Sequence, residues 1–343
     1  MDLRNQKFGI EIEMTGIKRK EAAEIINKYF KSKGNGESEI KYEGGYYDKY
    51  LVKEEENKYW QIVKDGSIVP KKSRGENNRG LDYYKVELVS PICSYKDIET
   101  VQDIVRELRE NGALINKSCG IHVHIDATNH TPNSLKNISN IINAKEDLIY
   151  KALNVSEERK RNFCKIVDEI YLERLNKFKP KTMEELKNIW YYRREYNHEN
   201  ITGRYHSSRY HALNLHSVFQ KGTVEFRYFN STLHAGKVKA YIQLCLAISA
   251  KAINQKRASP QKINTQNDKY SFRVWLLSLG LIGDEFKTAR KHLLSNLDGN
   301  SGWLTEEQAV AQRERLRQER VESEESTQEI TELENQENIR LTM

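Results

Sequence analysis

Strict alternation of apolar and polar residues marks four short segments of the chain. They read FGIEIEM (8–14), KVELVSP (85–91), CGIHVHID (119–126) and GTVEFRYF (222–229). Side chains two positions apart lie on the same face of a strand, so this period predicts strands with one apolar and one polar face. The pattern also predicts a hairpin around Gly44-Gly45 and further strands over residues 60–63, 84–89 and 209–216.

Between these strands lie segments in which apolar residues recur every three to four positions, which is the spacing of a helix. Gly34 and Gly112 follow two of the helical stretches and are typical residues just beyond a helix end. Residues 156–200 read as a helical, basic and aromatic insertion, and residues 305–320 as a polar helix. The other predicted helices cover residues 18–33, 98–111, 133–153, 236–255, 270–281 and 286–297.

The polar faces of the four alternating strands carry chemically active side chains. If the strands are neighbours in one sheet, these side chains form a single polar floor, with helices covering the opposite apolar face. The floor would hold four carboxylates, two imidazoles and one guanidinium. They belong to Glu11, Glu13, Glu87, Glu225, His122, His124 and Arg227.

Such a floor indicates a bound cation. Clustered carboxylates raise each other's pKa unless a positive charge compensates them, and Mg²⁺ or Mn²⁺ takes such oxygen ligands together with substrate phosphates. Arg227, two positions after Glu225, is suited to clamp a phosphate. Each motif alone is more often a solvated edge, a structural histidine pair or a salt pair within a strand. Their combination favours metal-dependent phosphoryl chemistry.

Composition narrows the class of protein. The 343 residues are enough for one large domain or two ordinary ones. Residues 305–343 carry 5 Arg/Lys and 11 Asp/Glu, so the tail has a net charge of −6 and the rest of the chain +13. A basic body favours anionic ligands, although a solvated Lys-rich surface explains most such excesses.

The cysteines and the chain start bear on location. The four cysteines are widely spaced, which argues against a zinc knuckle or a disulfide framework and predicts buried thiols. We expect no export signal and no membrane span, and hence a cytoplasmic protein.

Six motifs occur in an order that resembles the amidoligase family, which belongs to the glutamine synthetase-like carboxylate–amine ligases. They are FGIEIEM, WQIVKDGSI, VELVSP, CGIHVHID, RYHALNL and GTVEFRYFNSTLHAGKV, and the resemblance covers about residues 7–255. It implies an α+β fold in which a glutamine synthetase-like antiparallel sheet has a polar concave face and helices on its apolar face. It also implies an ATP-dependent ligase that forms an amide or isopeptide bond through an acyl phosphate, with Mg²⁺ or Mn²⁺.

The resemblance also implies roles for single residues. One metal would be bound by Glu11, His122 and Glu225, and a second by Glu13 and Glu87. A further carboxylate expected at the second metal cannot be identified from the sequence. Arg227 would contact the transferred phosphate, and His124 and Arg209 would line the nucleotide pocket. The catalytic residues would be Arg227, Glu87 and Arg209, with Asp65 and Ser67 as weaker candidates for substrate contacts.

These expectations give a domain plan and leave alternatives open. The plan is a catalytic domain over residues 1–256 that includes the insertion, a helical extension over 257–304 and a charged tail over 305–343. A carboxylate substrate and an amine donor are expected, among them peptides or proteins. Nucleic acid is a less favoured partner, and the C-terminal helix could join copies of the chain. A metal-dependent hydrolase or nuclease, or a degenerate ligase that only binds, would suit the same residues.

Overall fold

The chain forms two compact units, which we describe separately. The larger comprises Met1–Ile263 and Leu276–Asn296, and the smaller Asn264–Trp275 and Leu297–Met343. The expectations for residues 72–80, 194–199 and 322–343 lie outside the residues that the structure describes. This computed structural model describes residues 1–34, 36–71, 81–193, 200–203, 205–262, 265–305, 307–308 and 310–321.

A single antiparallel sheet is the centre of the larger unit. Its eight strands follow the order β2-β3-β4-β5-β1-β6-β8-β7 within the described residues. The four alternating segments form the strands β5, β1, β6 and β8, which are neighbours in the sheet in that order, so their polar faces can form one floor. The strands are β1 (Phe8–Met14), β2 (Ile40–Gly44), β3 (Lys49–Glu55), β4 (Lys58–Val63), β5 (Val86–Val89), β6 (Gly120–Asp126), β7 (Leu213–Asn214) and β8 (Thr223–Asn230).

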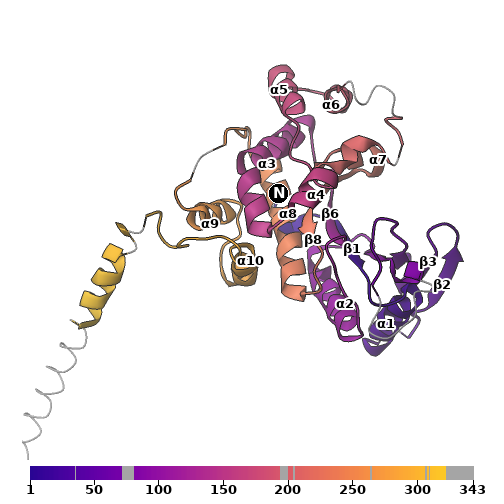
Figure 1. The fold of residues 1–343 in the computed structure, drawn as a ribbon. Coiled ribbons are helices and arrows are strands. Elements are labelled where there is room, and N and C mark those ends of the chain that lie inside the picture. The colour runs from indigo at the N-terminus through magenta and orange to yellow at the C-terminus, as the bar shows by residue number, and fades with distance from the viewer. Residues whose placement is uncertain are drawn as a thin grey trace, which may run out of the picture. The chain divides into compact units, whose positions relative to one another are not determined.

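The apolar face of the sheet packs against helices. Ile12 of β1 and Val123 of β6 are fully buried there. Helix α8 (Ala235–Asn254) contacts β1 and β6, while α2 (Ile98–Glu110) and α3 (Pro132–Leu153) pack against α8 (Figure 1). Burial of these side chains is the main stabilising term of the fold, at about 1.5–3 kcal/mol for each large aliphatic residue. The polar face is thereby left for the site.

Local sequence signals set the ends of the helices. The Thr131 side chain accepts a hydrogen bond from the backbone of Ser134, and Pro132 occupies the first turn of α3, whereas Asn154 ends it in a left-handed conformation. The described part of the insertion is helical, as predicted. The remaining α-helices are α1 (Arg19–Ser32), α4 (Glu157–Asn162), α5 (Glu169–Phe178), α6 (Met183–Trp190), α7 (His216–Lys221), α9 (Asp268–Ser278) and α10 (Lys287–Leu293).

Three predicted elements differ from the observed ones. Residues 209–216 were predicted as one strand, but only Leu213–Asn214 pair with β8, between a 3₁₀ turn over Ser207–Tyr210 and helix α7. Tyr84 belongs to the 3₁₀ turn Leu81–Tyr84 rather than to a strand, and the helix expected over 286–297 is reduced to α10. Periodicity places an element better than it fixes where the element begins and ends, which explains these errors.

The cysteines are buried thiols, as the sequence predicts. All four cysteines are free and buried. Among the described helices, none combines the length and the low polarity needed to cross a bilayer.

A buried carboxyl group on α3 gives a pH-dependent prediction. Glu146 is only 1% exposed, and its Oε1 accepts a hydrogen bond from the backbone of Val167. Burial raises the pKa of Glu146 from 4.5 to about 7. As pH rises above 4.5 the unfolded chain loses this proton first, so stability falls until the folded group ionises near pH 7. Glu146→Gln should therefore be more stable than wild type at pH 8, by about 3 kcal/mol.

Urea unfolding of both proteins at pH 4 and pH 8 measures this difference, which should vanish at pH 4. Asp147→Asn is the matched control, because Asp147 is the next residue and its side chain is 67% exposed. A lower stability of Glu146→Gln at pH 8 would contradict the prediction.

Candidate active site

A cleft of about 800 Å³ lies on the polar face of the sheet. That volume lies within the usual range for small-molecule sites. The lining includes carboxylates from β1, β5 and β8, basic side chains from several elements, and aromatic residues. Of the residues proposed from the sequence, it includes Glu11, Glu13, Asp65, Ser67, Glu87, His122, Arg209, Glu225 and Arg227.

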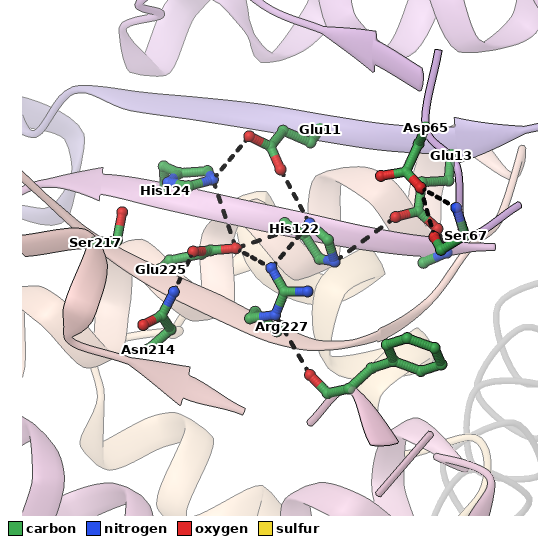
Figure 2. Close-up of polar contacts among 12 residues, drawn as sticks. Glu11, Glu13, Asp65, Ser67, His122, His124, Asn214, Ser217, Glu225 and Arg227 are labelled. Atoms are coloured by element: carbon green, nitrogen blue, oxygen red, sulfur yellow. Dashed lines mark hydrogen bonds and ion pairs between the residues drawn. The ribbon is translucent and has the colours of Figure 1, made fainter. Parts of the chain in front are cut away.

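Strand register brings the polar side chains together. Glu11 of β1 is paired with His122 of β6, and Glu13 is paired with Glu87 of β5. On the other side of β6, His124 is paired with Glu225 of β8. Directly paired residues have their Cβ atoms about 5 Å apart, so the four strands form one continuous polar floor. Figure 2 shows the part of this floor that comes from β1, β6 and β8.

Three overlapping groups of these side chains could each hold a metal ion. Within each group, one ligand atom per residue lies within 4.8 Å of the others. The resemblance implied that Glu11 and Glu225 share a metal with His122. In the structure His124 forms one group with Glu11 and Glu225, and His122 forms another with Glu11 and Glu87. His122 Nδ1 also lies 3.0 Å from Glu11 Oε2 and 3.8 Å from Glu225 Oε1, so the implied set stays a prediction. The groups are Glu11–His124–Glu225, Glu11–Glu87–His122 and Glu13–Asp65–Glu87.

His124 has the hydrogen-bonding arrangement of a metal ligand. Its Nδ1 lies 3.0 Å from Thr223 Oγ1, which fixes the ring. Its buried Nε2 makes no hydrogen bond within the described residues and lies 3.3 Å from Glu11 Oε1. Metal-binding histidines generally use one nitrogen for the ion and the other for such a fixing contact. His124 is therefore a candidate metal ligand, and its implied contact with the nucleotide stays a prediction.

Asp65 is a candidate for the further carboxylate that the sequence could not identify. Its Oδ1 accepts hydrogen bonds from the backbone and the hydroxyl of Ser67, both at 2.6 Å, and this turn follows β4. The turn brings Asp65 to Glu13 and Glu87. A KDGS sequence signals such an Asx turn, but only the pairing of β4 with β5 shows which carboxylates it faces.

Electrostatics at this end of the floor favour a bound cation. Burial, reinforced by the charge of Asp65, raises the pKa of Glu13 to about 7. Burial and the charges of Glu11 and Glu13 hold the pKa of Glu87 well above its ordinary value. These carboxylates thus lack compensating charge of their own, and a divalent cation would provide it.

The other end of the floor carries more positive charge. Burial would raise the pKa of Glu11, but the charge of the nearby His124, a hydrogen bond to His122 and the close contact with His124 outweigh it and leave that pKa well below its ordinary range. Burial would also raise the pKa of Glu225, but the charge of Arg227 and the two histidines outweigh burial and lower that pKa. Burial and the charge of Arg227 lower the pKa of His122 to about 4, so His122 is neutral at pH 7.

Arg227 is held by the protein itself. Its Nη1 donates to Glu225 Oε1 at 2.5 Å, and its Nε lies 3.4 Å from the carbonyl oxygen of Phe163. Between Phe226 and Phe229, β8 carries one residue more than the facing part of β6. Alternation directs Arg227 to the cleft and Tyr228 to the core, and the bulge turns the next residue, Phe229, to the core as well. Two of the three guanidinium nitrogens therefore already contact oxygen atoms of the protein, and the phosphate clamp expected from the sequence stays a prediction.

Two contributors to the site were missed in the sequence. Asn214 of β7 donates from Nδ2 to Glu225 Oε2 at 2.6 Å and so orients that carboxylate. Lys221 at the end of α7 places Nζ 3.4 Å from Glu11 Oε1. Asn214 lies in the quoted RYHALNL motif, which could have identified it, whereas nothing around Lys221 distinguishes it from other surface lysines.

Aromatic residues form the rim of the cleft. The hydroxyl of Tyr47, in the turn between β2 and β3, contacts the hydroxyl of Tyr205, which is 158 residues away in sequence. Arg209 lies over the rings of Tyr205 and Tyr210, with its guanidinium carbon 5.5 and 5.7 Å from their centroids. Arg209 therefore belongs to the rim rather than to the polar floor.

The sequence was compared with known proteins. A family model with the description "Putative amidoligase enzyme" matches residues 4–249. No curated protein matches the chain.

Proposed function

The chain belongs to the amidoligase family, and from this premise we propose that it is an ATP-dependent carboxylate–amine ligase. Family membership supports a ligase, and the Glu/His groups of the cleft support a metal-dependent one. The proposal includes a glutamine synthetase-like use of the sheet, with nucleotide and metal held on its polar face.

The proposed reaction has two steps. A carboxylate oxygen of the substrate attacks the terminal phosphorus of ATP, the bond to the bridging oxygen breaks, and ADP leaves. The nitrogen of an amine then attacks the acyl carbon, inorganic phosphate leaves with the former carboxylate oxygen, and the nitrogen loses a proton. ATP cleavage thus drives an otherwise unfavourable condensation.

The donor atoms fit a hard divalent cation. The candidate groups offer carboxylate oxygens and single imidazole nitrogens, and buried cysteines lie outside them. This chemistry suits Mg²⁺ or Mn²⁺ better than a thiolate-preferring metal. Glu11, His124 and Glu225 would hold one ion, and Glu13, Asp65 and Glu87 a second. When bound, the ions would neutralise charge on the transferring phosphate.

The remaining residues orient the reactants. Asn214 and Arg227 hold the Glu225 carboxylate from two sides. Lys221 and Arg209 supply positive charge along the cleft, where polyphosphate binds favourably. The turn at Asp65 and Ser67 and the aromatic rim would contact the carboxylate substrate or the amine donor, which we propose to include peptides or proteins.

One observation carries the proposal: buried carboxylates of uncompensated charge lie together in a cleft lined by basic side chains. Stability alone does not explain such a cluster, because each buried charge without a partner costs several kcal/mol.

A thermal-shift titration tests the proposed function. Wild type should be stabilised by ATP with Mg²⁺, by about 2.7 kcal/mol at 100 times Kd, and not by ATP with EDTA. Glu11→Gln should lose this effect because it removes a ligand shared by two candidate groups. Glu110→Gln should keep it, since that side chain is 63% exposed on α2. Stabilisation by Mg²⁺ with no further effect of ATP would instead favour a hydrolase.

A further inference from the structure

A second buried guanidinium lies beside the polar floor. Arg159 comes from α4, in the helical insertion, and is only 4% exposed although it lines the cleft. Its backbone is fixed by the Ser156 side chain, which accepts a hydrogen bond from Arg159 N. None of the quoted motifs includes this residue, because α4 lies between CGIHVHID and RYHALNL.

Arg159 forms no ion pair with a carboxylate within the described part of the chain, although its charge lowers the pKa of Glu13. Among the described residues its Nε is buried without a hydrogen bond, and its guanidinium donates one long hydrogen bond of 3.5 Å, from Nη2 to the carbonyl oxygen of Arg227. The thiol of Cys164, a weak acceptor, lies close enough to feel its charge. Arg227 differs in this respect, because Glu225 already neutralises it.

The polypeptide leaves room for this guanidinium. A Cβ atom at Gly120 would lie 2.5 Å from Arg159 Nη2 and 2.8 Å from Nη1. The backbone N–H of Gly120 donates to Glu13 Oε2 at 2.6 Å, so the guanidinium lies next to the anchor of a candidate metal ligand. Glycine at position 120 therefore permits a buried cation at the edge of the floor.

We propose that Arg159 is the receptor for an oxyanion in the cleft. A buried cation without a partner is costly, and a planar guanidinium matches phosphate and carboxylate geometry. The identity of the anion rests on the proposed function: it is the terminal phosphate of ATP or the carboxylate that accepts it. Arg227 then positions Glu225, and Arg159 takes the anion-binding role that the sequence assigned to Arg227.

The first test concerns the protein without ligand. Arg159→Met removes the uncompensated charge and keeps most of the side-chain volume, so its Tm should exceed that of wild type by at least about 2 °C. Arg161→Met is the matched control, because Arg161 lies exposed in the same helix. A fall in Tm for Arg159→Met would indicate a structural role and overturn the proposal.

The second test uses anions as probes, at constant ionic strength against chloride. Inorganic phosphate or acetate should raise the Tm of wild type and Arg161→Met, with at least tenfold weaker binding to Arg159→Met. Gly120→Ala should behave like Arg159→Met, because the new Cβ displaces only the end of a flexible side chain. Gly120→Ala thus checks the effect on anion binding independently, because it moves the guanidinium without removing Arg159.

Nucleotides distinguish the two sources of the anion. If Arg159 holds the terminal phosphate, wild type should bind Mg²⁺ with AMP-PNP more tightly than Mg²⁺ with ADP, and Arg159→Met should lose this preference. If it holds the acceptor carboxylate, acetate protection should depend on Arg159 while the nucleotide preference persists.

The outcomes separate this inference from the proposed function. Equal protection of wild type and Arg159→Met by phosphate and acetate, or no protection of wild type by either, would overturn the receptor whatever the nucleotides do. If phosphate protection depends on Arg159 but no nucleotide binds, the receptor stands and the ATP-dependent ligase fails.

Discussion

Glu13→Gln is expected to stabilise the ligand-free protein and to abolish Mg²⁺-dependent nucleotide binding. Burial and the charge of Asp65 raise the pKa of Glu13 from 4.5 to about 7. The folded carboxyl is therefore harder to ionise than the unfolded one, and stability is lost as pH rises from 4.5 to 7. Glutamine avoids this loss and can still accept the hydrogen bond from Gly120. The gain should be about 3 kcal/mol at pH 8 and should vanish below pH 4.5.

Chemical unfolding at both pH values and calorimetric titration with Mg²⁺-AMP-PNP measure the two effects. Glu24→Gln is the control, because its side chain is 55% exposed on α1. It should change neither quantity. If Glu13→Gln binds nucleotide as wild type does, Glu13 is not a ligand of the site.

Arg227→Ala should unfold more easily than wild type as well as lose binding. The sequence alone predicts loss of turnover with an intact fold. In the structure, however, Arg227 and Glu225 form a buried ion pair. Their side chains are each about 5% exposed, and Arg227 Nη1 lies 2.5 Å from Glu225 Oε1. Removing one partner leaves a buried charge, which costs about 3–5 kcal/mol.

The double variant Arg227→Met with Glu225→Gln separates the two consequences. It removes both charges, so much of the lost stability should return while nucleotide binding stays absent. Lys262→Ala serves as the control, since the Lys262–Asp147 pair is exposed and should contribute at most about 1 kcal/mol. An Arg227→Ala protein as stable as wild type would show that the ion pair does not stabilise the fold.

The polar floor could be predicted from the sequence because its signal is local. In FGIEIEM and CGIHVHID every second side chain lies on the same face of the strand. A shift of the strand register by one residue would place Glu11 or His122 in the apolar core. The helices that cover the apolar face were predicted for the same reason, since their apolar stripes repeat every three to four residues.

The grouping of ligands could not be predicted in this way. His122 and His124 lie on the same face of β6, and only the pairing of β6 with both β1 and β8 decides that His124 meets Glu225. The position of the Asp65 carboxylate depends on the turn after β4. The position of the Arg159 guanidinium depends on how the insertion packs over Gly120. Such contacts join residues that are far apart in sequence, where periodicity carries no information.

The contact between Tyr47 and Tyr205 has a kinetic consequence. Tyr205 is 59% exposed, and a hydrogen bond in such a place contributes about 0.5–1.5 kcal/mol. At 1 kcal/mol, roughly one molecule in six lacks this hydrogen bond at any moment. Entry of a bulky substrate at this edge therefore involves the breaking of side-chain contacts, of which this hydrogen bond and the stacking of Arg209 on Tyr205 are two.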